Sequence, residues 1–267
     1  MSKTSPPGRV MAVDWSGAVA GERKKIWLCE IAGGDVVRLE SGRSREALVA
    51  EVIDVAAVHP HLAAGFDFAF SFPAWFFAER GLPDVRALWA LAARDGEAWL
   101  RADVAPFWGA SGTRPPVLPA HTRRTEDEAG VRARMRPSSV FKLVGAGQVG
   151  RGSVRGMAAL AALADAGFAV WPFDVPGDGR PTVVEIWPRL LYVEPVVKSQ
   201  GKARASYLDR HAPHLTTDVR ASAEQSDDAF DALTSALAMW DHRAALGALP
   251  LAAGDEALEG RIWAPAA

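Results

Sequence analysis

The sequence predicts an α/β protein in which helices flank a mixed sheet. Short apolar runs and stretches of helical periodicity follow one another in the order strand, strand, strand, helix, strand. Hydrophobic residues make up 49% of the 267 residues and charged residues 23%, which is typical of a packed globular protein. Two of the predicted strands end in an aspartate, and an acidic helix is predicted near the C-terminus. These three observations favour a sheet with a polar site at one edge.

Composition limits the class of protein and its compartment. The formal charge of −2 excludes a strongly basic nucleic-acid coat and leaves room for a local basic patch. The single cysteine, Cys29, cannot form a disulfide framework or a zinc site, so we expect a reducing cytoplasm. No signal peptide or membrane-spanning run is predicted. We expect a disordered tail over residues 1–8 and one domain over residues 9–267.

The first half of the chain contains four predicted strands and one helix. Residues 33–35, Gly-Gly-Asp, are a hairpin signal, so the second and third strands are predicted to pair antiparallel. The predicted strands cover residues 10–14, 26–31, 36–39 and 62–67, and the predicted helix covers residues 46–58.

Asp14 ends the first of these strands and Asp67 ends the fourth. In open α/β sheets, functional sites gather at the carboxyl ends of the strands, so we expect these two aspartates to lie at one edge. The alternative for each one taken singly is a turn residue that leaves a strand.

Residues of about 73–140 are predicted to form a helical and loop insertion after the fourth strand. Trp75, Trp89 and Trp99 lie on helical stretches, where core packing is the expected role. Four prolines mark residues 106–119 as a loop, and Thr125 opens a pattern typical of a capping box and a short helix.

A basic stretch extends from Arg123 to Arg155. It carries eight positive charges against three acids within a nearly neutral chain, and two interpretations stay open. It is either a solvated surface or a wall that faces phosphate beside the acidic site. The eight residues are Arg123, Arg124, Arg132, Arg134, Arg136, Lys142, Arg151 and Arg155.

Within this stretch, Gly145, Gly147 and Gly150 follow the apolar run 141–144 and resemble a dinucleotide-binding pattern. Arg151-Gly152-Ser153 interrupts the pattern where a helix should already run, and the predicted helix covers residues 154–166. A flexible loop that contacts phosphate is therefore favoured over nicotinamide binding.

Glu185 lies among apolar neighbours in a further predicted strand, residues 182–188, and glutamate is disfavoured there. Water at an edge strand or a shared cation would supply its partner. Lys198, Lys202 and Arg204 follow in a segment that would either hold phosphate or face solvent.

The helix predicted over residues 226–240 carries the most informative acids. Ser226 is expected to cap it, and Asp227 and Asp228 suit the positive end of its dipole. Capping does not explain Asp231, which lies one turn past Asp228 on the same face and adjoins the apolar stripe. Stacked carboxylates repel, and a divalent cation would remove that cost.

Together these pieces resemble the RNase H-like fold in its RuvC-resolvase branch. More closely, the chain resembles a domain-of-unknown-function family of predicted RNase H-like nucleases. The matching segments run from the first strand to the last helix: residues 12–14, 65–67, 184–188, 198–204 and 227–232. The resemblance implies a five-stranded sheet in the order 3-2-1-4-5.

The activity that the resemblance implies is two-metal hydrolysis of a phosphodiester in DNA or RNA, with Mg²⁺ or Mn²⁺. The implied metal ligands are Asp14, Asp67, Asp228 and Asp231, with Glu185 as a further ligand or a base. The implied phosphate contacts are Lys142, Arg151, Lys198, Lys202 and Arg204. Two alternatives remain: a non-catalytic protein that binds a phosphorylated ligand, and a nicotinamide enzyme that uses Gly145, Gly147 and Gly150.

Overall fold

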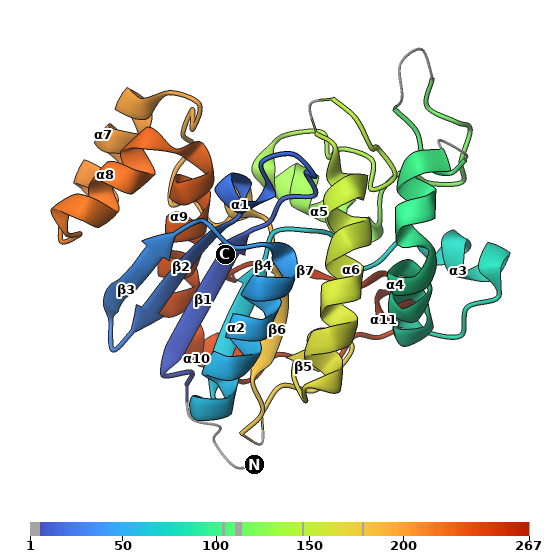
Figure 1. The fold of residues 1–267 in the computed structure, drawn as a ribbon, viewed down its shortest axis with the longest axis horizontal. Coiled ribbons are helices and arrows are strands. Elements are labelled where there is room, and N and C mark those ends of the chain that lie inside the picture. The colour runs from blue at the N-terminus through green and yellow to red at the C-terminus, as the bar shows by residue number, and fades with distance from the viewer. Residues whose placement is uncertain (1–5, 103–104, 110–113, 146, 178, 267) are drawn as a thin grey trace.

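A computed structural model describes residues 6–102, 105–109, 114–145, 147–177 and 179–266. It is an α/β structure with helices on both faces of a mixed sheet (Figure 1). Residues 1–5 of the predicted N-terminal tail lie outside the described residues. The strands are β1 (Arg9–Asp14), β2 (Trp27–Ala32), β3 (Asp35–Glu40), β4 (Leu62–Phe66), β5 (Ala169–Val170), β6 (Thr182–Ile186) and β7 (Ile262–Trp263).

The predicted order of the first four strands is confirmed. The sheet runs β3-β2-β1-β4-β6-β5, with β7 paired to β6. β1, β2 and β3 pair antiparallel, and β1, β4 and β6 pair parallel. The predicted number of five strands is wrong, because the described residues form seven. β5 and β7 have only two residues each, so neither shows the alternation that identifies a strand in a sequence.

Helices form one layer on each face. α2, α3, α4 and α6 enclose a core that includes Met11, Val13 and Phe66, while α7, α8 and α9 enclose a second core that includes Val10 and Ala12. The helices are α1 (Glu22–Lys25), α2 (Arg45–Val58), α3 (Ala74–Arg80), α4 (Val85–Ala102), α5 (Arg124–Ala133), α6 (Val149–Asp165), η1 (Pro188–Leu190), α7 (Gly201–His211), α8 (Thr217–Gln225), α9 (Asp227–Asp241), α10 (Arg243–Leu246) and α11 (Glu256–Glu259).

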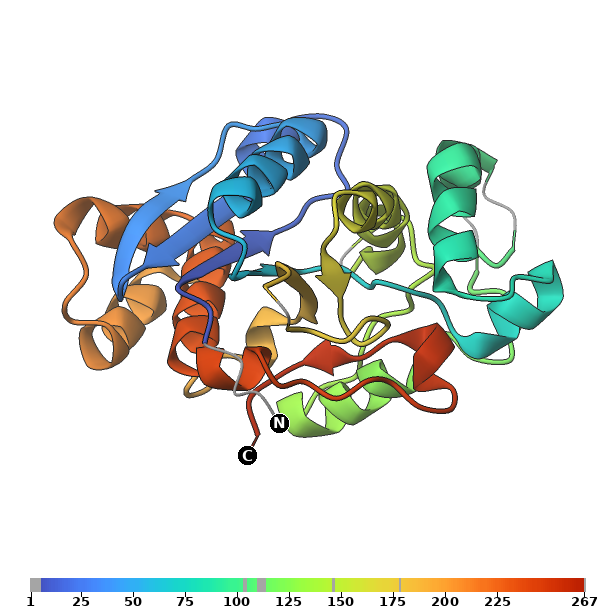
Figure 2. The same cartoon turned by 90° about the horizontal axis from the view of Figure 1, so that it is seen from below.

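The segment between β4 and β5 contains α3 to α6. Trp75, Trp89 and Trp99 lie on α3 and α4 and pack into the first core, as predicted. α5 lies beside β7 at the lower side of the molecule (Figure 2). None of the helices in the described part of the chain combines the length and the apolar character that crossing a membrane requires.

Two local predictions in this segment are wrong. The N-cap of α5 is Arg123, whose backbone N–H donates to Glu126, whereas Thr125 Oγ1 accepts a hydrogen bond from the Ile262 N–H at 2.8 Å. α6 begins at Val149 and runs through the three residues that were expected to interrupt it. Gly150 and Gly156 lie where a Cβ atom would come within 2.6 Å of Val140 O and 2.4 Å of the Phe68 ring. Close packing therefore explains the glycines, and it outweighs their low helix propensity.

Candidate acidic site at the carboxyl edge of the sheet

Asp14 and Asp67 lie next to each other at the end of two parallel strands. Val13 is in register with Phe66, and the Asp67 N–H donates to Val13 O at 3.1 Å. Side chains alternate between the faces of a sheet, and Ala12 belongs to the core on the α9 side. Asp14, two residues further along, therefore faces α9. The predicted placement of both aspartates at one edge is confirmed.

α9 brings two further aspartates to this edge. Ser226 Oγ caps the helix by accepting a hydrogen bond from the Ala229 N–H at 3.1 Å, as predicted. Asp227 and Asp228 lie in the first turn, and Asp231 follows with only 2% of its surface exposed. A Cβ atom on Gly65 of β4 would come within 2.6 Å of Met239 Sδ, so this glycine permits α9 to approach the sheet closely.

The four aspartates Asp14, Asp67, Asp228 and Asp231 form an acidic cluster in which burial and like charge act together. Burial, followed by the charges of Asp231, Asp67 and Asp228, raises the pKa of Asp14 well above its usual value. Burial and Asp231 raise the pKa of Asp67 to about 8. Burial is also the main cause of the raised pKa values of Asp228 and Asp231. In the metal-free protein these carboxyls therefore keep their protons to a higher pH than free aspartates do, and a bound cation would favour their ionised form.

The cation nearest to this cluster is the Lys198 ammonium, which forms an ion pair with Asp231 Oδ2. Burial opposes the charged form of Lys198, but the charges of Asp231, Asp14 and Asp67 more than offset it, and the pKa of Lys198 is raised. Tyr192 donates its hydroxyl to the other carboxylate oxygen of Asp231. Tyr192 could not be predicted from the sequence, because it lies in a short irregular segment with no periodicity.

The donor set suits a hard divalent cation, since it consists of carboxylate oxygens and three of the four acids are partly exposed. The ligand geometry is not formed, however. In the part of the chain that the structure describes, no three His, Cys, Asp or Glu side chains are arranged around one possible metal position. Tyr192 and Lys198 account for this at Asp231, because they contact both of its oxygens.

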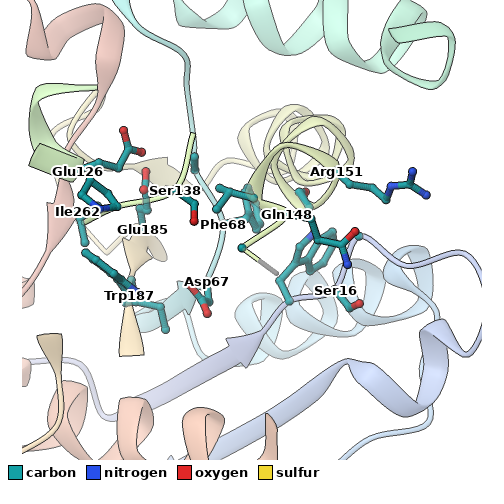
Figure 3. Close-up of a pocket in the computed structure, with 18 of the residues that line it drawn as sticks. Ser16, Asp67, Phe68, Glu126, Ser138, Gln148, Arg151, Glu185, Trp187 and Ile262 are labelled. Atoms are coloured by element: carbon teal, nitrogen blue, oxygen red, sulfur yellow. The ribbon is translucent and has the colours of Figure 1, made fainter. Parts of the chain in front are cut away.

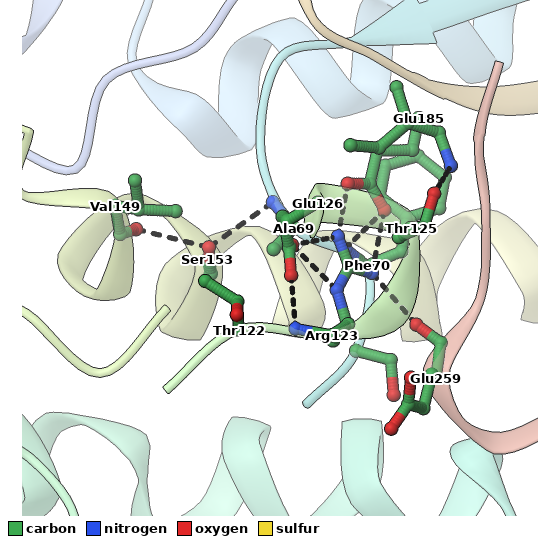
Figure 4. Close-up of polar contacts among 12 residues, drawn as sticks. Ala69, Phe70, Thr122, Arg123, Thr125, Glu126, Val149, Ser153, Glu185 and Glu259 are labelled. Carbon is green, nitrogen blue, oxygen red and sulfur yellow. Dashed lines mark hydrogen bonds and ion pairs between the residues drawn. The ribbon is translucent and has the colours of Figure 1, made fainter. Parts of the chain in front are cut away.

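Glu185 has a partner that the sequence analysis did not foresee (Figure 4). It lies on β6, between β4 and β5 rather than at an exposed edge, and is 3% exposed. Its carboxylate accepts hydrogen bonds from the Phe70 N–H at 2.9 Å and from the Arg123 guanidinium. Like Val183, it faces the first core, on the opposite face of the sheet from Asp14. The predicted partners, water or a shared cation, are replaced by an arginine.

Arg123 itself is fully buried and joins three segments (Figure 4). It pairs with Glu126 of α5 and with Glu185 of β6, and its Nη1 donates to Glu259 O at 2.8 Å. The prediction that Arg123 belongs to a solvated or phosphate-facing stretch is wrong. One positive charge here faces two negative charges. Burial raises the pKa of Glu126 to about 7, although Arg123 acts against that rise.

The predicted phosphate contacts have different surroundings. Lys202 is exposed at the start of α7, and Lys142 lies 5.7 Å from the centroid of the Trp108 ring. Arg151 lines a pocket beside the acidic cluster. Arg204 is buried, and its guanidinium donates to the backbone carbonyls of Lys198, Ala223 and Glu224. This arginine therefore holds the chain together and is not free for phosphate.

The glycine pattern lacks the context that a dinucleotide site requires. Residues 141–144 form no strand, and Lys142 pairs with Trp108 as an isolated bridge. Gly145 and Gly147 have positive φ values of 86° and 70°, and Ala146 between them lies outside the described residues. Without a preceding strand, the pattern does not support nicotinamide binding.

The raised pKa of Asp67 predicts how stability changes with pH in metal-free buffer. The unfolded chain releases this proton near the ordinary value of 3.8, whereas the folded protein retains it until about pH 8. The folded state is therefore favoured at low pH, and the melting temperature should fall as pH rises from about 5 to about 8. Glu126 acts in the same direction. In thermal melts at constant ionic strength, the melting temperature of Asp67→Asn should fall less with pH than that of the wild type. Equal slopes for the two proteins would contradict the raised pKa of Asp67.

Comparisons with protein-family models, with curated proteins and with solved structures found no match to this chain. The resemblance to RNase H-like nucleases therefore stays a prediction from the sequence.

Proposed function

We propose that this chain is a divalent-metal-dependent nuclease of the RNase H-like fold, in its RuvC-like branch. The observation that carries the proposal is the convergence of four aspartates from two strand ends and one helix, with the Lys198 ammonium as the cation nearest to them. Buried, clustered carboxyls are unfavourable in their ionised form unless a cation binds. The strand order β3-β2-β1-β4 and the late acidic helix also support the proposal.

Asp14, Asp67, Asp228 and Asp231 would hold Mg²⁺ or Mn²⁺. When bound, such ions activate water and stabilise the leaving oxygen of a phosphodiester. In the hydrolysis, the water oxygen bonds to phosphorus, the ester P–O bond breaks, and the leaving oxygen gains a proton. Glu185 stays outside this ligand set, because Arg123 neutralises it on the other face of the sheet.

The proposal gives Lys198 one role without a metal ion and another once a metal ion binds. Without a metal ion, its ammonium neutralises Asp231 from a partly exposed position. A divalent cation that replaced this ion pair would free the Lys198 ammonium to bind a phosphate oxygen of DNA or RNA.

One observation favours a second candidate function. Because Lys198 already pairs with Asp231, the acidic cluster can be partly neutral without metal, as in a non-catalytic protein that binds a phosphorylated ligand. Such a protein would bind nucleic acid or a smaller phosphate compound. It would cleave neither of them, whichever divalent ion is added.

The experiment is a cleavage panel. Labelled single-stranded, duplex, branched and hybrid oligonucleotides are incubated with the purified protein and Mg²⁺, Mn²⁺ or EDTA. We expect products with at least one substrate in Mg²⁺ or Mn²⁺ and none in EDTA. Absence of cleavage across the panel, with retained binding, would favour the non-catalytic candidate.

A further inference from the structure

A cavity of about 410 Å³ opens directly beside the acidic cluster (Figure 3). Asp67 and Glu185 contribute to its wall, as do the segment after β1 and the first turn of α6. Its volume lies at the lower end of the range of about 300–1,000 Å³ that is typical of small-molecule pockets. A paired and stacked base cannot enter a space of this kind, whereas an unpaired nucleotide can.

The apolar part of the wall is aromatic. Trp15 and Phe68 pack against each other with ring centroids 5.2 Å apart, and the Trp15 Nε1–H donates to Gly152 O at 3.1 Å. Trp187 lies on the Asp67 side of the cavity and is partly exposed (Figure 3). Aromatic rings bind any base through its π-face, so this wall suits a nucleobase without selecting its sequence.

The polar part of the wall can bind the edges of a base and a phosphate. Ser16, Ser138 and the exposed Gln148 line it with hydroxyl and amide groups, which both donate and accept hydrogen bonds. Arg151 lies at the opposite end from Glu185 (Figure 3). Its Nε atom is buried and has no hydrogen-bond partner among the described residues. This buried donor has no protein acceptor and can therefore bind an acceptor from a ligand or a water molecule.

Two arginines hold the part of this wall that follows β1, residues 16–18, in place. Arg45 Nη1 donates to the backbone carbonyls of Ser16 and Ala18, both at 3.0 Å, and Arg155 donates to that of Gly17. A Cβ atom on Gly17 would come within 2.4 Å of the Gly152 nitrogen, so this segment lies directly against α6. The cavity is therefore formed before any ligand binds.

We infer that this cavity binds one unpaired nucleotide of a single-stranded substrate and so places the adjoining phosphodiester at the acidic cluster. The inference rests on the proposed function and specifies its substrate class as single strands or frayed ends. The base contacts the aromatic wall, Gln148 and the serines contact its polar edge, and Arg151 donates hydrogen bonds to a flanking phosphate.

The test uses thymidine 5′-monophosphate and the indole N–H signal of Trp187 in two-dimensional NMR spectra of the full chain. The nucleotide should shift this signal in the wild type. Gln148→Trp, which fills the cavity from an exposed position, should weaken binding at least tenfold. Trp187→Ala, which removes a ring instead, should weaken it as well when binding is followed by isothermal calorimetry. The matched control is His61→Trp, at an exposed position directly before β4 and at the opposite end of that strand from Asp67, which should bind within twofold of wild type.

Cleavage separates this inference from the proposed function. If both hold, the wild type should cut a single strand at least tenfold faster than a duplex, and Gln148→Trp should lose that preference. Nucleotide binding without cleavage would overturn the proposed nuclease function and leave the inference that the cavity binds a nucleotide. Two results would overturn the inference that the cavity binds a nucleotide and leave the proposed nuclease function: equal cleavage of single strand and duplex, or a Trp187 signal that the nucleotide does not shift.

Discussion

Asp231→Asn should abolish cleavage while the protein remains folded. Asn keeps the shape of the side chain but removes one of the four carboxylates that we propose hold the metal ion. Groups that only orient a metal ligand cost about 10–100-fold when removed, so loss of a ligand should exceed about 100-fold. The initial rate of cleavage of the best substrate of the panel, in Mg²⁺, measures the effect.

Asp227→Asn is the matched control for this substitution. Asp227 belongs to the same helix and lies in its first turn, where a carboxylate suits the dipole. We expect it to retain cleavage within a few-fold of wild type. Binding of the oligonucleotide by Asp231→Asn should equal or exceed that of wild type, because a negative charge near phosphate is lost. Cleavage that survives Asp231→Asn would point to another site or to a contaminating nuclease.

Arg123→Met should cause the largest loss of stability of any single substitution discussed here. It leaves Glu126 and Glu185 in the interior without their cation, and it also removes the hydrogen bond to Glu259 O. Breaking a buried ion pair by removing one partner typically lowers the free energy of unfolding by about 3–5 kcal/mol. Urea denaturation followed by circular dichroism measures this change.

The neighbouring residue supplies the control. Arg124 is exposed, and its contact with Asp255 is long at 3.4 Å, so Arg124→Met should change the free energy of unfolding by less than about 1 kcal/mol. Burial raises the pKa of Glu126 and Arg123 opposes that rise, so without Arg123 this carboxyl is neutral at pH 5, and the loss caused by Arg123→Met should be smaller at pH 5 than at pH 8. A loss that does not depend on pH, or one no larger than that of Arg124→Met, would contradict this account of the buried network.

The parts of the site that could be predicted from the sequence depend on local patterns. Asp14 and Asp67 each follow a short apolar run, and Asp231 follows Asp228 by three residues within an apolar periodicity. The pairing of β1 with β4 and the packing of α9 on the sheet then bring them together. Ser226 was predictable for the same reason, because a cap depends on its immediate neighbours.

The parts that could not be predicted depend on contacts between distant segments. Arg123 and Glu185 are 62 residues apart, and each was interpreted separately, one as a surface charge and the other as a carboxylate in need of water or a cation. The start of α6 was misplaced because Gly150 and Gly152 disfavour a helix, whereas the close packing of Gly150 against Val140 is visible only in the folded chain. The cavity beside Asp67 is formed by several separate segments and has no sequence pattern.

The central claim, that the acidic cluster is a binding site for a divalent cation, is tested most directly by titrating the protein with Mn²⁺ and measuring the electron paramagnetic resonance signal of the free ion. The account predicts that the wild type removes at least one equivalent of Mn²⁺ from solution at neutral pH. It also predicts that Asp14→Asn, which lacks the aspartate adjacent to Asp67, binds far more weakly while Asp227→Asn binds as the wild type does. A wild-type titration in which all the Mn²⁺ stays free, or an Asp14→Asn variant that binds as tightly as the wild type, would contradict it.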